Sequence, residues 1–211
     1  MSPPARLAVD ASRPATAAIE AAIRVLRAGG LVAVPTETFY GLGARALDAS
    51  AVARVFVAKG RPADKPLLIL VDSVAMVEGV ARDVPDRARR LMARYWPGAL
   101  TLVLSAHPDL PAALTGGTGT IGVRLSPHPL ARALVAGLGE PVTAPSANPH
   151  GGASPRTADE VIAGLADRVD LVLDGGATPG GPASTLLDLT RTPPAVLRAG
   201  AVALARNELE G

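Results

Sequence analysis

The two lysines of the chain, Lys59 and Lys65, are the first residues whose placement indicates chemistry. Both lie in one short segment, on either side of Arg61, and every other permanently cationic side chain of the protein is arginine. An ammonium is a compact, mobile charge, whereas a guanidinium is a planar fork. Lysine kept in one place therefore predicts a cationic turn with a specific role, and the alternative is chance placement on a solvated helix end.

Small polar and cationic residues also gather at the ends of predicted strands. In chain order they are Thr36, Thr38, Arg124, Ser146, Asn148, Ser154, Ser184 and Arg198. Ligands collect at strand-end loops in open α/β sheets. Hydroxyls beside a cationic turn favour an anionic ligand with many acceptors, such as a nucleotide triphosphate. Asn148 adds weight because only one other asparagine is present, although asparagine is also an ordinary turn-former.

Several common signatures of catalytic sites are missing. The chain has no Gly-x-x-x-x-Gly-Lys-Ser/Thr loop, no Gly-x-Gly-x-x-Gly opening a helix and no Gly-x-Ser-x-Gly. The absence of cysteine excludes disulfides, thiolate metal sites and a cysteine nucleophile. His107, His128 and His150 are widely spaced, and each neighbours proline or glycine. Loop surface is the favoured interpretation of the three histidines, so we predict no metal site made of protein side chains.

Alternating helices and strands must position these residues. Hydrophobic periodicity and capping residues predict helices at 14–28, from Asp48 or Ser50 to Gly60, at 73–81, 84–95 and 129–137, and from Thr157. Apolar runs predict strands at 31–34, 67–71, 100–104, 121–125, 141–144, 169–173, 185–189 and 195–197. The alternation predicts an α/β domain in which helices cover a mixed sheet.

Length and composition fit one domain. The chain has 211 residues, of which 48% are hydrophobic and 2% aromatic, so its core must consist of aliphatic side chains. We expect residues 1–14 to be a loose N-terminal tail and residues 203–211 a C-terminal tail. No apolar run could span a membrane and no signal peptide is evident, which predicts a cytoplasmic protein. The net charge of +2 permits phosphate contact without arguing for nucleic acid.

Several independent motifs, spread over roughly residues 15–202, resemble the YrdC-like family. In chain order they are Pro35-Thr36-Glu37-Thr38-Phe39-Tyr40-Gly41-Leu42-Gly43, Lys59-Gly60-Arg61-Pro62, Trp96-Pro97-Gly98, Thr101-Leu102-Val103-Leu104, Val123-Arg124, Ala144-Pro145-Ser146-Ala147-Asn148, Ser154-Pro155, Ser184-Thr185 and Leu197-Arg198. The resemblance implies one family domain over 15–202, with a twisted, largely open mixed sheet flanked by helices and a large ligand cleft.

The resemblance also implies a reaction. The best-known members of the family are threonylcarbamoyl-AMP synthases, nucleotidyltransferases that condense L-threonine, bicarbonate or carbon dioxide, and ATP to threonylcarbamoyl-AMP and pyrophosphate. A separate transferase then moves the threonylcarbamoyl group to adenosine in tRNA, and a weak contact with tRNA itself is a further expectation. Such chemistry needs positioning and charge neutralisation more than a covalent nucleophile, which suits a chain without cysteine.

Residue by residue, the resemblance assigns two sets of contacts. The ATP ligands would be Lys59, Arg61, Lys65, Thr120, Ser146, Asn148, Ser154 and Arg198. Lys59 and Arg61 would also act in catalysis. The threonine site would consist of Thr38, Arg124 and Ser184, with Arg124 pairing with the substrate carboxylate and Thr36 supporting the turn. Mg²⁺ is expected with the triphosphate, held by phosphate and water.

Two departures from the family pattern leave room for a different substrate. Many relatives have histidine about where Leu70 lies, and many have asparagine in place of Lys65. One alternative function is an RNA-binding family member without catalysis, although no aromatic stacking platform is evident. The other is a carbamoyl-transfer relative that acts on a different acceptor.

Overall fold

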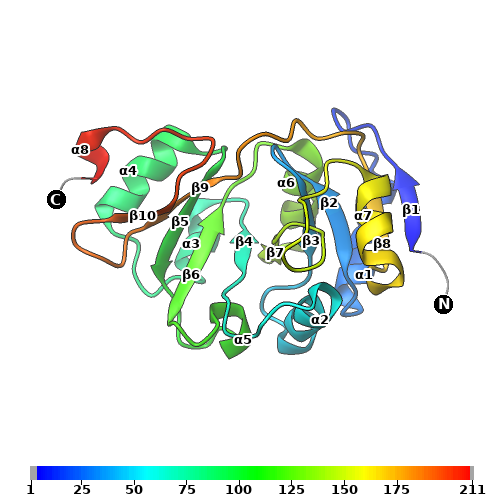
Figure 1. Ribbon diagram of the computed structural model, residues 1–211, viewed down its shortest axis with the longest axis horizontal. Coiled ribbons are helices and arrows are strands. Elements are labelled where there is room, and N and C mark those ends of the chain that lie inside the picture. Colours follow the sequence, from blue (N-terminus) through cyan, green and yellow to red (C-terminus); the bar gives the residue numbers. More distant parts are fainter. Residues whose placement is uncertain (1–3, 210–211) are drawn as a thin grey trace.

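The computed structural model describes residues 4–209, and its strands form two mixed sheets (Figure 1). The helices are α1 (Thr16–Arg27), α2 (Ala49–Lys59), α3 (Val74–Glu78), α4 (Asp86–Tyr95), α5 (Ala112–Thr115), α6 (Pro129–Leu138), α7 (Ala158–Leu165) and α8 (Arg206–Leu209), with a 3-10 turn at Ala166–Arg168. The strands are β1 (Ala5–Ala8), β2 (Val32–Pro35), β3 (Tyr40–Gly43), β4 (Leu68–Leu70), β5 (Leu100–Ser105), β6 (Thr120–Arg124), β7 (Val142–Thr143), β8 (Leu171–Asp174), β9 (Thr185–Asp188) and β10 (Ala195–Arg198).

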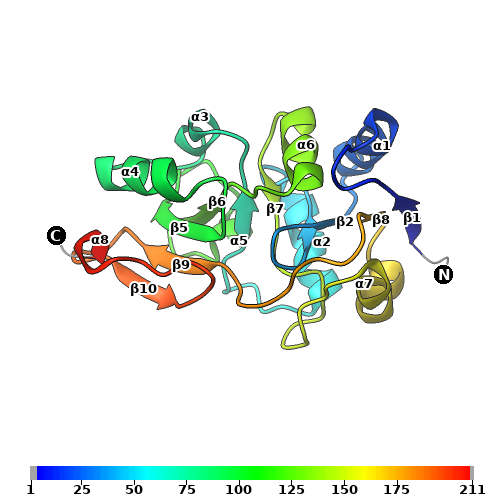
Figure 2. The same cartoon turned by 90° about the horizontal axis from the view of Figure 1, so that it is seen from above.

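The strand order is β1-β8-β2-β3 in the smaller sheet and β10-β9-β5-β6-β4-β7 in the larger. In the smaller sheet β8 is parallel to both β1 and β2, while β3 is antiparallel to β2. The larger sheet alternates antiparallel pairs with the parallel pairs β5–β9 and β4–β6. Helices α1, α3, α4 and α6 lie on one side of the sheets and α7 on the other (Figure 2). The predicted α/β class is confirmed.

The two sheets meet where the segment 141–147 runs antiparallel to β3. Four backbone hydrogen bonds of 2.7–3.0 Å join this segment to β3 and to the residues just after it, including Leu42 N to Pro145 O and Ala147 N to Tyr40 O. The buried Thr143 hydroxyl adds two more, because it donates to Leu42 O (3.0 Å) and accepts from Ala44 N (2.9 Å). The strands therefore continue from one sheet into the other, and the seam lies at the centre of the molecule.

Local sequence explains the elements that flank the seam. Asp48 caps α2, since its carboxylate accepts from Ser50 N (2.9 Å) and Ala51 N (3.2 Å). The helix ends at Gly60, which takes the left-handed conformation (φ 59°) that favours glycine. In β2 all four residues are buried, because α1 and α6 cover one face and the main core lies on the other.

The expected N-terminal tail is wrong for residues 5–8. These residues form β1, which pairs in parallel with β8. Arg6 reinforces the pairing, because its Nε and Nη2 donate to Asp174 Oδ2 at 2.9 and 2.7 Å. The sequence does not predict this strand, because it is only four residues long, lies at an exposed edge and shows no alternation of buried and exposed residues.

The strand β3, which was not predicted from the sequence, follows the hydroxyl-rich turn after β2 directly. The expected C-terminal tail also contains an ordered helix, α8, whose Glu208 Oε2 accepts from Tyr95 Oη (2.8 Å). Of the residues expected in the two tails, 1–3 and 210–211 lie outside the described part of the chain. Among residues 4–209, no helix combines the length and apolar character needed to cross a membrane.

The seam makes a testable prediction at Thr143. Thr143→Val keeps the side-chain shape but leaves Leu42 O and Ala44 N buried without that partner, so we expect the free energy of unfolding to fall by about 2–3 kcal/mol. Thr143→Ser keeps the hydroxyl and loses one methyl group, which should cost about 1 kcal/mol. Urea unfolding measures both. A valine variant at least as stable as the serine variant would contradict the role of the hydroxyl.

Candidate active site

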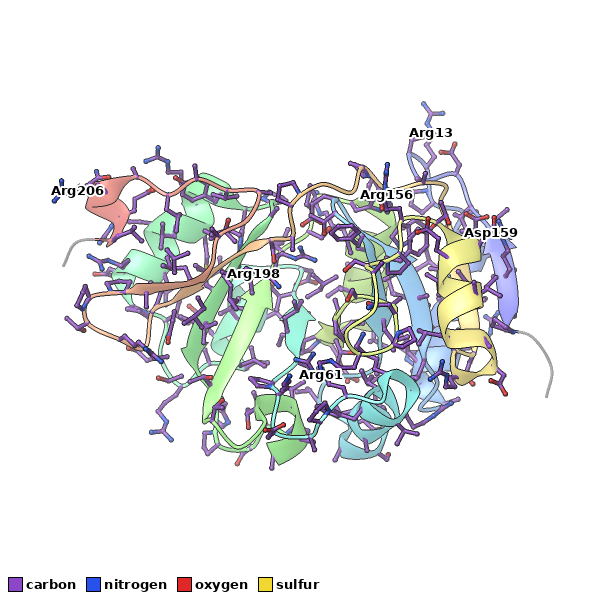
Figure 3. The ribbon with its side chains drawn as sticks, in the orientation of Figure 1. Arg13, Arg61, Arg156, Asp159, Arg198 and Arg206 are labelled. Carbon is purple, nitrogen blue, oxygen red and sulfur yellow. The ribbon has the colours of Figure 1, made fainter. Side chains whose placement is uncertain are left out.

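Two cavities open next to each other beside the seam. The smaller, about 90 Å³, lies between the β2–β3 turn, β6 and the segment 183–184. The larger, about 270 Å³, lies between the C-terminal end of α2, β6 and β10. Leu68, Ser146 and Arg198 line both, so the cavities share a wall. Arg61 and Arg198 both lie in the central part of the molecule, whereas Arg13 and Arg206 lie at its periphery (Figure 3).

The smaller cavity combines hydroxyl groups with two guanidinium groups. Its polar lining residues are Thr36, Thr38, Arg124, Ser146, Ser154, Ser184 and Arg198. The rest of the lining is Phe39, Tyr40, Gly41, Leu68, Ala144 and Ala183. No carboxylate lines it, so this cavity suits a small ligand with an anionic group.

Arg124 is the most deeply buried cation of this cavity, with a side-chain exposure of 5%. Its Nη1 lies 2.9 Å from Glu37 Oε1, although the two groups are not aligned as a hydrogen bond. Ser126 Oγ donates to the other Glu37 oxygen, Oε2. Burial lowers the pKa of Arg124, Glu37 opposes that shift, and Arg198 adds to it. Arg124 Nε is buried without a hydrogen-bond partner, so one donor of the guanidinium is unused.

Ser184 ties Arg198 to the smaller cavity. Arg198 Nε donates to Ser184 O (3.0 Å) and its Nη2 donates to Ser184 Oγ (3.1 Å). The same Oγ lies 2.8 Å from Thr101 Oγ1 on β5. Burial lowers the pKa of Arg198. The guanidinium that faces both cavities is therefore held by a residue of the smaller one.

The β2–β3 turn is held by Thr36, as expected from the sequence. Thr36 Oγ1 donates to Phe39 O (2.7 Å) and accepts from Thr38 N (3.3 Å). From the other side, Gly180 N donates to Thr38 O (2.9 Å). These bonds direct the Thr38 side chain into the smaller cavity.

Lys59 holds one wall of the larger cavity. Its Nζ donates to Ser146 O and to Asn148 O, both at 2.5 Å, so the last turn of α2 grips the loop after β7. Burial, followed by the charge of Arg61, lowers the pKa of Lys59 to about 8. Arg61 in turn donates from Nη2 to Pro66 O (3.0 Å), and burial lowers its pKa. An anion in this cavity would meet two partly desolvated cations.

Much of the remaining lining of the larger cavity is apolar. These residues are Pro66, Leu67, Leu68, Val103, Pro145, Leu186 and Leu197. Leu197 on β10 is 49% exposed, which is unusual for leucine in a strand of this protein. A ligand with an apolar ring and an anionic tail would fit a cavity that combines apolar and cationic lining.

The residues assigned from sequence come together here, with two exceptions. Thr38, Lys59, Arg61, Thr120, Arg124, Ser146, Ser154, Ser184 and Arg198 each line one or both cavities. Asn148 does not, because its Nδ2 donates to Pro149 O (2.9 Å) and Gly152 O (2.7 Å) within its own loop. Lys65 is exposed, and its Nζ lies 3.3 Å from His150 Nε2.

Sequence reasoning gave no role to Glu37, the counter-ion of Arg124. The signal was a carboxylate inside a turn that directly follows a fully buried strand. Leu70, the position noted for its family departure, is buried in the core beneath α6 and lines neither cavity, whereas Leu68 lines both. Within residues 4–209 no cluster of three His, Asp or Glu side chains could hold a metal ion.

Comparison with known proteins identifies the family. The family model for Sua5, YciO and YrdC proteins, described as "Telomere recombination", matches residues 24–200. Threonylcarbamoyl-AMP synthase of Pyrococcus abyssi is 45% identical over 190 residues, which cover 90% of this chain and 56% of that protein. Threonylcarbamoyl-AMP synthase of Bacillus subtilis is 43% identical over 185 residues, which cover 87% of this chain and 54% of that protein.

A solved structure agrees with these matches. The crystal structure of P. abyssi Sua5 complexed with L-threonine aligns with a TM-score of 0.89 and 44% identity, covering 92% of this chain and 57% of that one. The chain thus spans about half the length of the curated relatives named above. Because the family model covers most of the chain and the fold agrees, the protein belongs to the Sua5/YciO/YrdC family.

Proposed function

We propose that the protein is a threonylcarbamoyl-AMP synthase, which condenses L-threonine, bicarbonate and ATP to threonylcarbamoyl-AMP and pyrophosphate. The names of its relatives and the threonine complex of P. abyssi Sua5 support the proposal. The observation that carries it is the shared wall, since Ser146 and Arg198 face two cavities of different size and character. A small amino acid and a nucleotide would meet at this wall.

The smaller cavity would hold L-threonine. The protein itself illustrates how a guanidinium edge grips a carboxylate, because Arg45 Nε and Nη2 donate to the two oxygens of Glu140 at 3.2 and 2.9 Å. Arg124, which lines the smaller cavity, would pair with the threonine carboxylate in the same way. Thr38 and Ser184 would contact the rest of the amino acid.

The larger cavity would hold ATP. Its apolar wall suits the adenine ring, and Lys59 and Arg61 suit the phosphates. Neither cavity is lined by Asp, Glu or His, so the protein offers no cage for Mg²⁺. A Mg²⁺ ion would enter with the triphosphate, coordinated by its oxygens and by water, and we assign no step to it.

The chemistry at the shared wall consists of two bond-forming steps. Bicarbonate supplies carbon dioxide with loss of hydroxide, and the neutral threonine nitrogen bonds to its carbon and loses a proton. A carbamate oxygen then bonds to the α-phosphorus, while the bond from that phosphorus to the bridging oxygen breaks and pyrophosphate leaves. Arg198, which faces both cavities, would stabilise the negative charge on the carbamate and on the α-phosphate.

The product would pass to other proteins. Threonylcarbamoyl-AMP is a mixed anhydride, so we propose that a cytoplasmic transferase accepts it and modifies adenosine in tRNA. A synthase of this kind needs no tight RNA contact of its own.

Product identification tests the function. The purified chain, incubated with ATP, Mg²⁺, L-threonine and bicarbonate, should form a species with the mass of threonylcarbamoyl-AMP together with an equal amount of pyrophosphate. Mass spectrometry and a pyrophosphate assay measure both. Pyrophosphate release that persists without threonine, or no release at all, would refute the proposal.

Arg124→Lys tests the amino-acid site. Lysine keeps the charge but loses the planar fork, so the KM for threonine should rise by about 10–100-fold while the KM for ATP changes by less than about twofold. Arg45→Lys is the matched control, because Arg45 also pairs with a glutamate but lines neither cavity. Equal increases in both KM values would show that Arg124 does not act on threonine specifically.

Lys59 makes a prediction about proton uptake. With a pKa of about 8, Lys59 is mostly neutral at pH 8.5, and a bound triphosphate raises the pKa and favours the ammonium. Binding of ATP at pH 8.5 should therefore take up about 0.7 of a proton, since the phosphates are already ionised at this pH. Calorimetry in two buffers with different ionisation enthalpies measures the uptake. Lys59→Arg, whose charge is permanent, should abolish it, and undiminished uptake in that variant would contradict the assignment.

A further inference from the structure

A histidine lies next to Lys59 and Arg61, the cations that line the larger cavity. His150 follows the loop that Lys59 grips, and its backbone N–H donates to Lys59 O (2.7 Å), the last carbonyl of α2. Its Nε2 lies 3.3 Å from Lys65 Nζ, and Lys65 O accepts from Arg61 Nε (3.3 Å). The four basic residues, Lys59, Arg61, Lys65 and His150, are thus a series of neighbours that begins at the larger cavity.

The contact between Lys65 and His150 is compatible with one protonation state of the ring. An ammonium has three donors and no acceptor, so the contact is a hydrogen bond when Nε2 accepts, which requires a neutral ring with its proton on Nδ1. Burial and the charges of Lys65, Arg61 and Lys59 lower the pKa of His150. Asp64 opposes the lowering of the Arg61 pKa. The unliganded site therefore keeps His150 neutral by excess positive charge.

We propose that His150 and Lys65 form a proton-regulated extension of the phosphate site, in which His150 becomes a cationic ligand only when a polyphosphate is bound. An incoming terminal phosphate attracts the Lys65 ammonium away from Nε2. Nε2 then takes one proton from solvent, and the imidazolium donates to a phosphate oxygen. No covalent bond changes, and the proton comes from water or buffer.

The inference rests on the proposed function, because it assigns the larger cavity to the triphosphate of ATP. It adds a residue that no motif singled out. It also adds a pH window, since His150 would strengthen ATP binding at acidic pH and lose that contribution as the pH rises. That window is separate from the uptake by Lys59 near pH 8.5.

The test compares ATP affinity at two pH values. ATP dissociation constants are measured by calorimetry at pH 6.0 and pH 8.0 for the wild type, His150→Asn and His107→Asn. His107 is the control, because it is a partly exposed loop histidine that pairs with Asp109 through Nδ1 (3.6 Å) and lines neither cavity. The γ-phosphate itself titrates near pH 6, so the comparison is between variants at the same pH.

At pH 6.0 we expect His150→Asn to bind ATP about fivefold more weakly than the wild type, and at pH 8.0 to match it within about twofold. The His107→Asn control should match the wild type at both values. Proton uptake on binding at pH 7.0 should also be smaller in His150→Asn. A loss that is equal at the two pH values, or no loss at either, would overturn the inference.

Two further measurements separate this inference from the proposed function. One outcome is threonine-dependent pyrophosphate release together with a ratio of the ATP dissociation constants of His150→Asn and the wild type that is the same at both pH values. That result would support the proposed function and refute the role of His150. If ATP binds with the expected pH dependence but no threonylcarbamoyl-AMP forms, the role of His150 stands and the function falls. If ATP does not bind at either pH, both are wrong.

Discussion

The buried charge of Arg124 is the constraint on which the site depends. A desolvated guanidinium costs several kcal/mol unless it is compensated. Its compensation is Glu37, which comes from the turn of the other sheet and is held in turn by Ser126. The ion pair therefore crosses the gap between the two sheets, and it can form only if both are in place. Arg124 also lines the smaller cavity, so the same arrangement that stabilises the charge also places it where a ligand can meet it.

The loop after β7 is fixed from two sides, which gives the shared wall its shape. On one side its backbone bonds to β3, and on the other Lys59 donates to the carbonyls of Ser146 and Asn148. Lys59 therefore has a structural role beside its electrostatic one. This explains why a lysine suits the position, since a single ammonium can reach two carbonyls that converge on one point.

Local patterns predicted most elements, and the failures have physical causes. The caps of α2 could be read from Asp48 and Gly60, because both act within one turn of chain. In contrast, β1 exists because of its pairing with β8, more than 160 residues away, which no window of sequence contains. The strand β3 carries two glycines, which weaken a strand locally. Close approach explains them, because a Cβ on Gly43 would lie 2.9 Å from Val142 Cγ1.

For the candidate site, the types of residue could be predicted from the sequence, whereas the contacts between them could not. Lysine kept in one turn and hydroxyls at strand ends indicated an anionic ligand, but the contact that holds Arg198 depends on Ser184 and Thr101 meeting across β5 and β9. Through this contact, the position of a side chain that lines both cavities depends on a residue of the smaller one. Arg198 lines both cavities, and its position is set by Ser184, which lines the smaller one. A substitution that removes the Ser184 hydroxyl would therefore also release the cation at the shared wall.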